Sequence, residues 1–329
     1  MTPAADTEAG SAAGIVRLTA RRSDNALFPA DPGAHFRIKE GTEMKALVYG
    51  ETIWDVYPDG EVIGGAPFNF SAHLAHLGNE VRLITAVGND SLGDRAFEQM
   101  KYHRIDTSFV QRNSYPTGRC DVTLDENGIP HYDIVKDVSY DHIAVDDALI
   151  QAIKDYAPDV FYFNSLIQRS DESRAGLLKI LDMCRFRQVF CDINIREGCF
   201  DRFSLAVCME RSTILKVSSE ESHWLYDIGL LKAREINFPR SAAKQYPSLD
   251  LIIYTLGKDG SQIYDTRTKM TYLSGKPESV PVVSTVGAGD CYGATFIDSY
   301  MRGDSLRDSM ERATERSNLV VSRKEAVPF

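Results

Sequence analysis

Residues 282–301 read VVSTVGAGDCYGATFIDSYM, where an apolar run stops at a Gly-Ala-Gly-Asp turn and resumes with helical periodicity. Gly287 and Gly289 leave the backbone free of side chains, so successive amide groups can point at one spot beside the positive end of a helix dipole. We expect an anion to bind there. Asp290 falls in the first helical turn, where its carboxylate can take a proton from an attacking hydroxyl. Phosphoryl transfer requires this pairing of amide donors and a base.

Other interpretations of the turn remain open at this point. An aspartate in the first turn of a helix often only caps the helix or interacts with its dipole, and glycine-rich turns before helices are frequent. Gly287, Gly289 and Gly293 also loosely match the dinucleotide-binding fingerprint, but no acidic residue ends a second strand about 20 residues later. On their own, these residues favour a structural role.

Composition narrows the class of protein. A chain of 329 residues with 43% hydrophobic and 26% charged residues suits one large α/β domain or two ordinary ones. The net charge of −10 argues against nucleic acid or an anionic membrane as the main partner. The six cysteines form no C-x-x-C pair, no signal peptide is evident and no apolar stretch is long enough for a membrane helix. We therefore expect a cytoplasmic protein with reduced thiols.

The first 43 residues differ from the rest, because they are small and polar and lack sustained periodicity. They carry more acidic residues than a transit peptide would. We expect residues 1–43 to form a disordered extension and residues 44–329 to form the working domain.

Two features near the start of this domain suggest a ligand. Asp55 stands among large apolar residues in TIWDVY, either as an exposed strand-end residue or as a carboxylate that accepts hydrogen bonds from ligand hydroxyls. Gly64 and Gly65 precede a predicted helix. They form either a simple turn or a close approach of the backbone to a ligand, with Asn69 offering an amide donor and acceptor.

Buried strands alternate with helical patterns along the chain. Strands are predicted at residues 45–50, 81–88, 160–163, 189–193, 213–217 and 251–255. This alternation predicts a doubly wound, mainly parallel sheet flanked by helices, whose ligands bind at the carboxyl ends of the strands. Polar segments follow three of these strands: DINIR at 192–196, KVSSEE at 216–221 and TLGKDG at 255–260.

Each polar segment has a structural alternative. The first can be a solvated turn, although Arg196 would suit a phosphoryl group. In the second, Ser218 and Glu221 have the spacing of a capping box. The third can be a β-hairpin turn. Because all three meet at one edge of the sheet, a ligand site there gains support.

The alternation breaks between residues 115 and 141. Short strands surround Asn127-Gly128, a strong hairpin signal, and a segment at 52–63 has a strand pattern that can pair with them. We expect these segments to form a small β lid that excludes water from a sugar-sized cleft. The alternative, compatible with the first, is a ribbon through which a homodimer forms.

Taken in order, these motifs resemble the ribokinase-like (PfkB) carbohydrate kinases, and among them the fructokinases. The segments that carry the resemblance are GETIWD, IGGAPFNFSAHLAHLG, AVGNDSLG, DINIR, KVSSEE, TLGKDG and STVGAGD. The resemblance implies a ribokinase-like fold with a β lid, and transfer of the ATP γ-phosphate to a sugar hydroxyl with Mg²⁺.

The resemblance also implies a role for particular residues. Asp290 matches the catalytic base, the backbone of Gly287, Ala288 and Gly289 matches the anion hole, and Arg196 matches an arginine near the transferred phosphate. The implied sugar-binding positions are Asp55, Gly64, Gly65 and Asn69. The implied nucleotide positions are Lys216, Ser218, Glu221, Thr255, Gly257 and Gly260, with Mg²⁺ near Glu221 through water.

Three positions depart from the family pattern. Ser284 stands where aspartate is frequent, which leaves a potassium requirement open, Ser218 replaces asparagine, and Glu325 replaces glycine. We expect a kinase that phosphorylates a primary hydroxyl of fructose or a similar ketose. The alternatives are a kinase for 2-keto-3-deoxygluconate or another sugar acid, with Arg119 as the extra cationic contact, and a non-catalytic relative that only binds.

Overall fold

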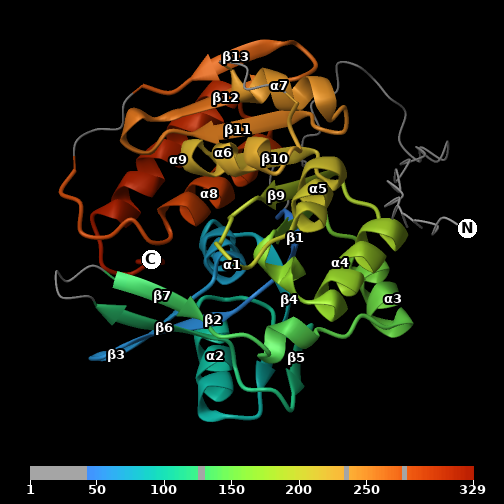
Figure 1. Ribbon diagram of the computed structural model, residues 1–329, viewed down its shortest axis with the longest axis vertical. Coiled ribbons are helices and arrows are strands. Elements are labelled where there is room, and N and C mark those ends of the chain that lie inside the picture. The colour runs from blue at the N-terminus through green and yellow to red at the C-terminus, as the bar shows by residue number, and fades with distance from the viewer. Residues whose placement is uncertain (1–42, 125–129, 233–236, 276–279) are drawn as a thin grey trace, which may run out of the picture. The chain divides into compact units, whose positions relative to one another are not determined.

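A nine-stranded sheet forms the centre of the computed structural model, which describes residues 43–124, 130–232, 237–275 and 280–329 (Figure 1). Its strand order is β13-β12-β11-β10-β9-β8-β1-β4-β5. The strands are β1 Lys45–Tyr49, β4 Glu80–Gly88, β5 Val110–Asn113, β8 Val160–Asn164, β9 Gln188–Asp192, β10 Ile214–Ser218, β11 Leu251–Thr255, β12 Ser261–Asp265 and β13 Met270–Leu273. All neighbours pair parallel except β11–β12 and β12–β13.

Both faces of this sheet are buried by helices. In β1, Leu47 and Tyr49 point into one apolar cluster, and Ala46 and Val48 point into the other, because successive side chains of a strand alternate between faces. On the first face lie α3 Asp147–Tyr156, α4 Asp171–Met183, α5 Arg202–Arg211, α6 Ser219–Asp227 and α7 Phe238–Gln245. On the second lie α1 Ala66–His76, α2 Ser91–Tyr102, α8 Ala288–Arg302 and α9 Leu306–Val321.

The predicted doubly wound fold is confirmed. The sequence pattern missed β5, β12 and β13, which are four to five residues long. The TLGKDG segment connects β11 to antiparallel β12 through a short 3₁₀-helix, Gly257–Asp259, so its interpretation as a hairpin turn is correct. No described helix is long and apolar enough to span a membrane.

A second, four-stranded sheet has the order β3-β2-β6-β7 and lies at the lower left of Figure 1. Its strands are β2 Ile53–Tyr57, β3 Gly60–Gly64, β6 Arg119–Leu124 and β7 Pro130–Ile134. As predicted, the 52–63 segment pairs with the later one, through parallel β2 and β6, and β6 pairs antiparallel with β7. The expected Asn-Gly turn and the extension before residue 43 lie outside the described residues.

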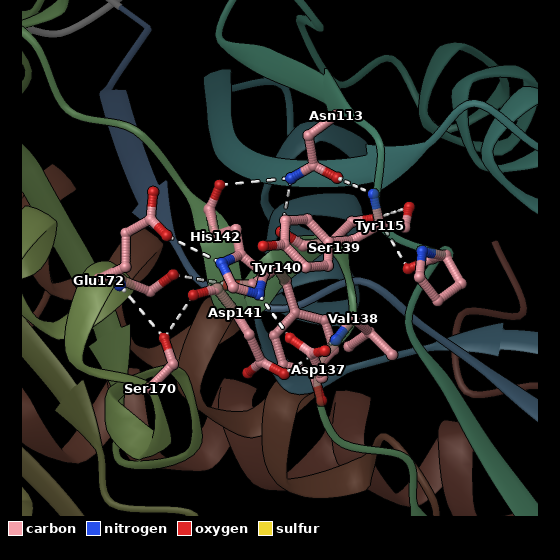
Figure 2. Close-up of polar contacts among 12 residues, drawn as sticks. Asn113, Tyr115, Asp137, Val138, Ser139, Tyr140, Asp141, His142, Ser170 and Glu172 are labelled. Atoms are coloured by element: carbon pink, nitrogen blue, oxygen red, sulfur yellow. Dashed lines mark hydrogen bonds and ion pairs between the residues drawn. The ribbon is translucent and has the colours of Figure 1, made fainter.

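The chain returns from the small sheet to the core through a polar cluster (Figure 2). His142 lies between Asp137, whose carboxylate is 2.9 Å from Nε2, and Glu172 of α4, whose carboxylate is 2.8 Å from Nδ1. Its ring stacks on Tyr115 with the centroids 3.5 Å apart. These contacts tie the segment after β7 to α4.

Candidate active site

Most helices of this protein begin at a residue whose side chain caps the first turn. In the described part of the chain, seven of the nine α-helices have such a cap; the exceptions are α1 and α8. Both begin at a glycine with a positive φ, Gly65 with φ 97° and Gly287 with φ 78°. An uncapped helix start keeps amide donors available for a ligand.

The two glycines also permit close contacts. A Cβ on Gly65 would lie 2.8 Å from the backbone oxygen of Glu51, and a Cβ on Gly287 would lie 2.6 Å from the Cβ of Ala326. Beside the α8 start, a Cβ on Gly289 would lie 3.2 Å from Nζ of Lys216. The Gly-Ala-Gly turn therefore has backbone donors and an ammonium group in one place.

Asp290 lies in the first turn of α8, and its side chain reaches toward α1. Its Oδ2 accepts a hydrogen bond from Nδ2 of Asn69 at 2.8 Å. Burial raises the pKa of Asp290, although Asn69, Lys216 and Arg196 each act to lower it. The structure thus brings Asp290 and Asn69 into contact, with Lys216 and Arg196 close enough to act on the carboxylate.

Two further carboxyl groups, those of Asp55 and Glu51, lie near Arg196. Burial raises the pKa of Asp55 to about 6, and Arg196 acts against that rise. Gly64 lies beside it, since a Cβ there would be 3.4 Å from Oδ2 of Asp55. Glu51 is only 1% exposed, and its two oxygens accept hydrogen bonds from Nδ2 of Asn164 at 2.8 and 3.0 Å.

Sequence reasoning missed Glu51. Burial raises its pKa to about 7; Arg196 lowers it, and Asp290 raises it further. The signal was present, because this acid follows the apolar strand β1 at the carboxyl edge of the sheet.

The end of β9 and the loop after it provide two charged groups with different environments. Asp192 is buried and pairs with Nζ of Lys216 at 2.7 Å. Burial lowers the pKa of Lys216, but Asp192 and Glu221 outweigh this and raise it, so the ammonium stays charged. Arg196 is exposed and forms no ion pair with any residue in the described ranges. It remains available for a ligand.

Ser218 and Glu221 form the capping box that their spacing allowed. Ser218 accepts the amide of Glu221 at 3.1 Å, and Oε2 of Glu221 accepts the amide of Ser218 at 2.8 Å. Oε1 of Glu221 accepts the amide of Ile195 at 2.8 Å. Both carboxylate oxygens thus bind backbone, and Glu221 holds the loop that carries Arg196.

A pocket of about 570 Å³ lies beside the Gly-Ala-Gly turn, and Ala288 and Gly289 of the turn line it. Its lining includes Thr255, Gly257, Gly260, Ala288, Gly289 and Tyr292. The predicted nucleotide loop and the predicted anion hole therefore share one cavity. Its size is in the range of small-molecule sites.

Arg119 does not lie with the other predicted sugar-binding residues. In the small sheet Arg119 pairs with Trp54, and Cys120 pairs with Asp55. Paired residues share a face and successive residues alternate, so Arg119 and Asp55 point to opposite faces. Arg119 instead bonds Asp121 at 3.1 Å.

The described residues contain no group of three or more His, Cys, Asp or Glu side chains able to hold a metal ion directly. Mg²⁺ dehydrates reluctantly and is bound largely through phosphates and water. The uncapped start of α8 beside Lys216 is a matching cradle for those phosphates.

Comparison with known proteins places this geometry in context. Residues 43–328 match the sequence profile described as "pfkB family carbohydrate kinase". An ATP-dependent 6-phosphofructokinase of Thermoanaerobacterium thermosaccharolyticum is 25% identical over 82% of this chain and 81% of its own length. A fructokinase of Salmonella typhimurium is also 25% identical, over 78% of this chain and 84% of its own length.

A solved structure has the same fold. The fructokinase of Vibrio cholerae, with fructose, ADP and calcium bound, superposes with a TM-score of 0.70 at 17% identity, covering 87% of this chain and 95% of that one. The two curated relatives are equally similar to this chain and differ in their named substrates. Overall identity thus leaves the choice of sugar to the site.

Proposed function

Because the chain belongs to the pfkB family of carbohydrate kinases, which are ATP-dependent phosphotransferases, we propose that it phosphorylates a primary hydroxyl of fructose or a similar neutral ketose. One observation carries the proposal. Asp290 lies at the uncapped start of α8, directly after two residues that line the pocket of the 255–260 loop, and its carboxyl group interacts electrostatically with Arg196 and Glu51.

In this proposal Asp290 takes the proton of the sugar hydroxyl as the hydroxyl oxygen attacks the γ-phosphorus and the bond to the β-phosphate oxygen breaks, so that ADP leaves. Burial raises the pKa of Asp290, which makes its carboxylate a stronger proton acceptor. The amides at the start of α8, together with Lys216 and Arg196, are placed to stabilise negative charge on the transferred group.

ATP would occupy the pocket beside the 255–260 loop, with its phosphates directed at the α8 start. Bound Mg²⁺ would neutralise charge on the phosphate oxygens. Glu221 contributes indirectly by fixing the backbone of Ile195, next to Arg196.

The charge of the sugar side supports a neutral substrate over a sugar acid. Asp55 and Glu51 lie there with Arg196 as the cation that acts on both. Arg119, the expected partner of a substrate carboxylate, points to the other face of the small sheet. A substrate carboxylate would therefore meet carboxyl groups and compete with the γ-phosphate for Arg196.

A substrate panel tests the proposal. Phosphorylation of fructose, 2-keto-3-deoxygluconate and fructose 6-phosphate is measured with ATP and Mg²⁺, with Asp290→Asn as the blank. We expect kcat/KM to be highest for fructose. A preference for either anionic sugar would contradict the neutral assignment, and ATP consumption that no sugar stimulates would favour the non-catalytic alternative.

A further inference from the structure

Helix α1 directs two buried side chains at the catalytic turn. Asn69 and His73 are four residues apart and therefore lie on one face of the helix. Nδ2 of Asn69 donates to Oδ2 of Asp290 at 2.8 Å, and Nε2 of His73 lies 3.0 Å from the carbonyl oxygen of Ala326. The two side chains are 3% and 0% exposed. Neither contact was evident from the sequence, because the partners lie more than 200 residues away.

Ala326 connects the second contact to the anion site. The Cβ of Ala326 lies where a side chain on Gly287 would begin, 2.6 Å from that position. The ring of Phe329 packs against that of His73, with 6.0 Å between the centroids. The guanidinium of Arg316 lies over the ring of Phe329, 3.9 Å from its centroid. His73 thus holds a segment that packs directly on the first glycine of the turn.

The protonation state of His73 fits a fixed strut. Burial lowers its pKa to about 3, so the ring is neutral over the pH range in which an enzyme of this kind works. A neutral ring that contacts a carbonyl must carry its proton on Nε2, because only an N–H can donate to that oxygen. No described group partners Nδ1.

We propose that helix α1 positions the catalytic turn, with Asn69 orienting the carboxylate of the base and His73 orienting the glycine of the anion site. The proposal rests on the proposed function, because it assigns these residues to the same reaction. Asn69 and His73 are positioning residues in this role.

The contact to Asn69 has a chemical consequence for the base. It occupies Oδ2 of Asp290 and leaves Oδ1 to receive the proton. The buried Oδ1 of Asn69 has no partner among the described residues, while Nδ2 donates to Asp290. The charged groups that act on Asp290 from the surrounding elements are Lys216 of β10, Arg196 and Asp192 from β9 and its loop, and Glu51 after β1.

Asn69→Ala tests the first half. Losing a hydrogen bond that stabilises the charged carboxylate raises the pKa of Asp290, so the acidic limb of the kcat–pH profile should move to higher pH. At neutral pH kcat should fall by roughly tenfold or more. Asn69→Ser has a shorter hydroxyl donor, and its kcat should lie between those of the unmodified protein and Asn69→Ala. A rise in sugar KM with an unmoved acidic limb would show that Asn69 contacts sugar only, and would overturn this half.

His73→Ala tests the second half. We expect kcat to fall by roughly tenfold, with the KM values for ATP and sugar and the acidic limb unchanged, and His73→Gln, which restores an N–H donor, to recover most of the loss. His76→Ala is the matched control, since His76 lies on the same helix and bonds His103. Equal effects at residues 73 and 76, or no recovery with glutamine, would overturn this half.

The two proposals can fail separately. If Asp290→Asn keeps its turnover, the proposed function fails. If Asp290→Asn is inactive while the α1 variants have wild-type kcat and pH profiles, only the positioning role of α1 fails. Thermal unfolding of each variant distinguishes a folded protein with low kcat from an unstable one.

Discussion

Helices α6 and α8 begin in opposite ways, although both starts lie near the charged groups Lys216 and Asp290. At α6, Ser218 and Glu221 satisfy each other's amides, and Glu221 also holds Ile195. At α8, Gly287 offers no side chain, and the turn instead meets Lys216 and Ala326. At α6 a side chain caps the first turn and the carboxylate of Glu221 fixes a loop, whereas at α8 no side chain caps the first turn. The difference between the two starts is thus whether a side chain occupies the first amides of the helix.

The largest effect should come from removing the base at the open start. Asp290→Asn keeps the size of the side chain and abolishes proton acceptance, so kcat should fall by about a thousandfold or more. Calorimetric binding of sugar and nucleotide should persist. Turnover of the unmodified protein should fall as pH drops through the raised pKa of Asp290. Loss of binding together with loss of turnover would contradict a role limited to proton transfer.

Closing the open start should have the next largest effect. Gly287→Ala places a Cβ 2.6 Å from Ala326 and keeps a left-handed conformation that alanine adopts poorly. We expect kcat to fall by roughly a hundredfold and KM for ATP to rise. Steady-state kinetics at saturating sugar measure both. Near-normal kinetics would mean that the turn tolerates displacement and that its amides do not bind phosphate.

Removing the side-chain cap at the start of α6 should mainly affect stability. Ser218→Ala removes the cap of α6 and should lower the free energy of unfolding by about 1 kcal/mol, with a few-fold loss of kcat because Glu221 holds the Arg196 loop less firmly. Chemical denaturation measures the first quantity. Ser305→Ala is the matched control, because Ser305 caps α9 through Asp308. An equal loss of kcat in both variants would remove any link between the α6 cap and turnover.

The smallest expected effect concerns the polar cluster around His142. Burial alone would lower the pKa of His142, but Asp137 and Glu172 outweigh it and raise the pKa (Figure 2). Because the folded pKa exceeds the unfolded one, this contribution is complete below about pH 6.5 and is lost as pH rises through the folded pKa.

His142→Asn should therefore reduce the free energy of unfolding more at about pH 5.5 than at about pH 8.5, by less than about 1 kcal/mol. Denaturation curves at the two pH values measure the difference. An equal reduction at both would mean that His142 contributes through stacking on Tyr115 and not through charge.

The sequence predicted the fold well, because its signals are local. Apolar strands such as 160–163 and the helix after Gly65 can be recognised within a few residues, and the chemistry at the ends of β9, β10 and β11 follows from the rule that ligands bind at carboxyl ends of parallel strands. The edge strand β13 was missed because it is four residues long and only partly buried. Strand β12 was missed because only two of its five residues, Ile263 and Tyr264, are apolar.

The rest depends on contacts that no local pattern contains. Arg119 is adjacent to Cys120 in sequence, yet which face it takes depends on its pairing with Trp54, 65 positions earlier. The carboxylate of Glu51 accepts its hydrogen bonds from Asn164, which lies 113 residues away in the sequence. Lys216 was assigned to the nucleotide segment, but its partner Asp192 could be identified only once β9 and β10 were known to be neighbours.

The packing of α1 against α8 has a consequence for protein synthesis. Phe70 of α1 lies against Gly293 of α8, where a Cβ would be 3.6 Å from its ring. During translation α1 leaves the ribosome more than 200 residues before α8. The apolar surface of α1 that packs on α8 therefore stays without this partner for most of the elongation time. The nascent chain is therefore most exposed to aggregation, and most in need of a chaperone, until its final segment is released.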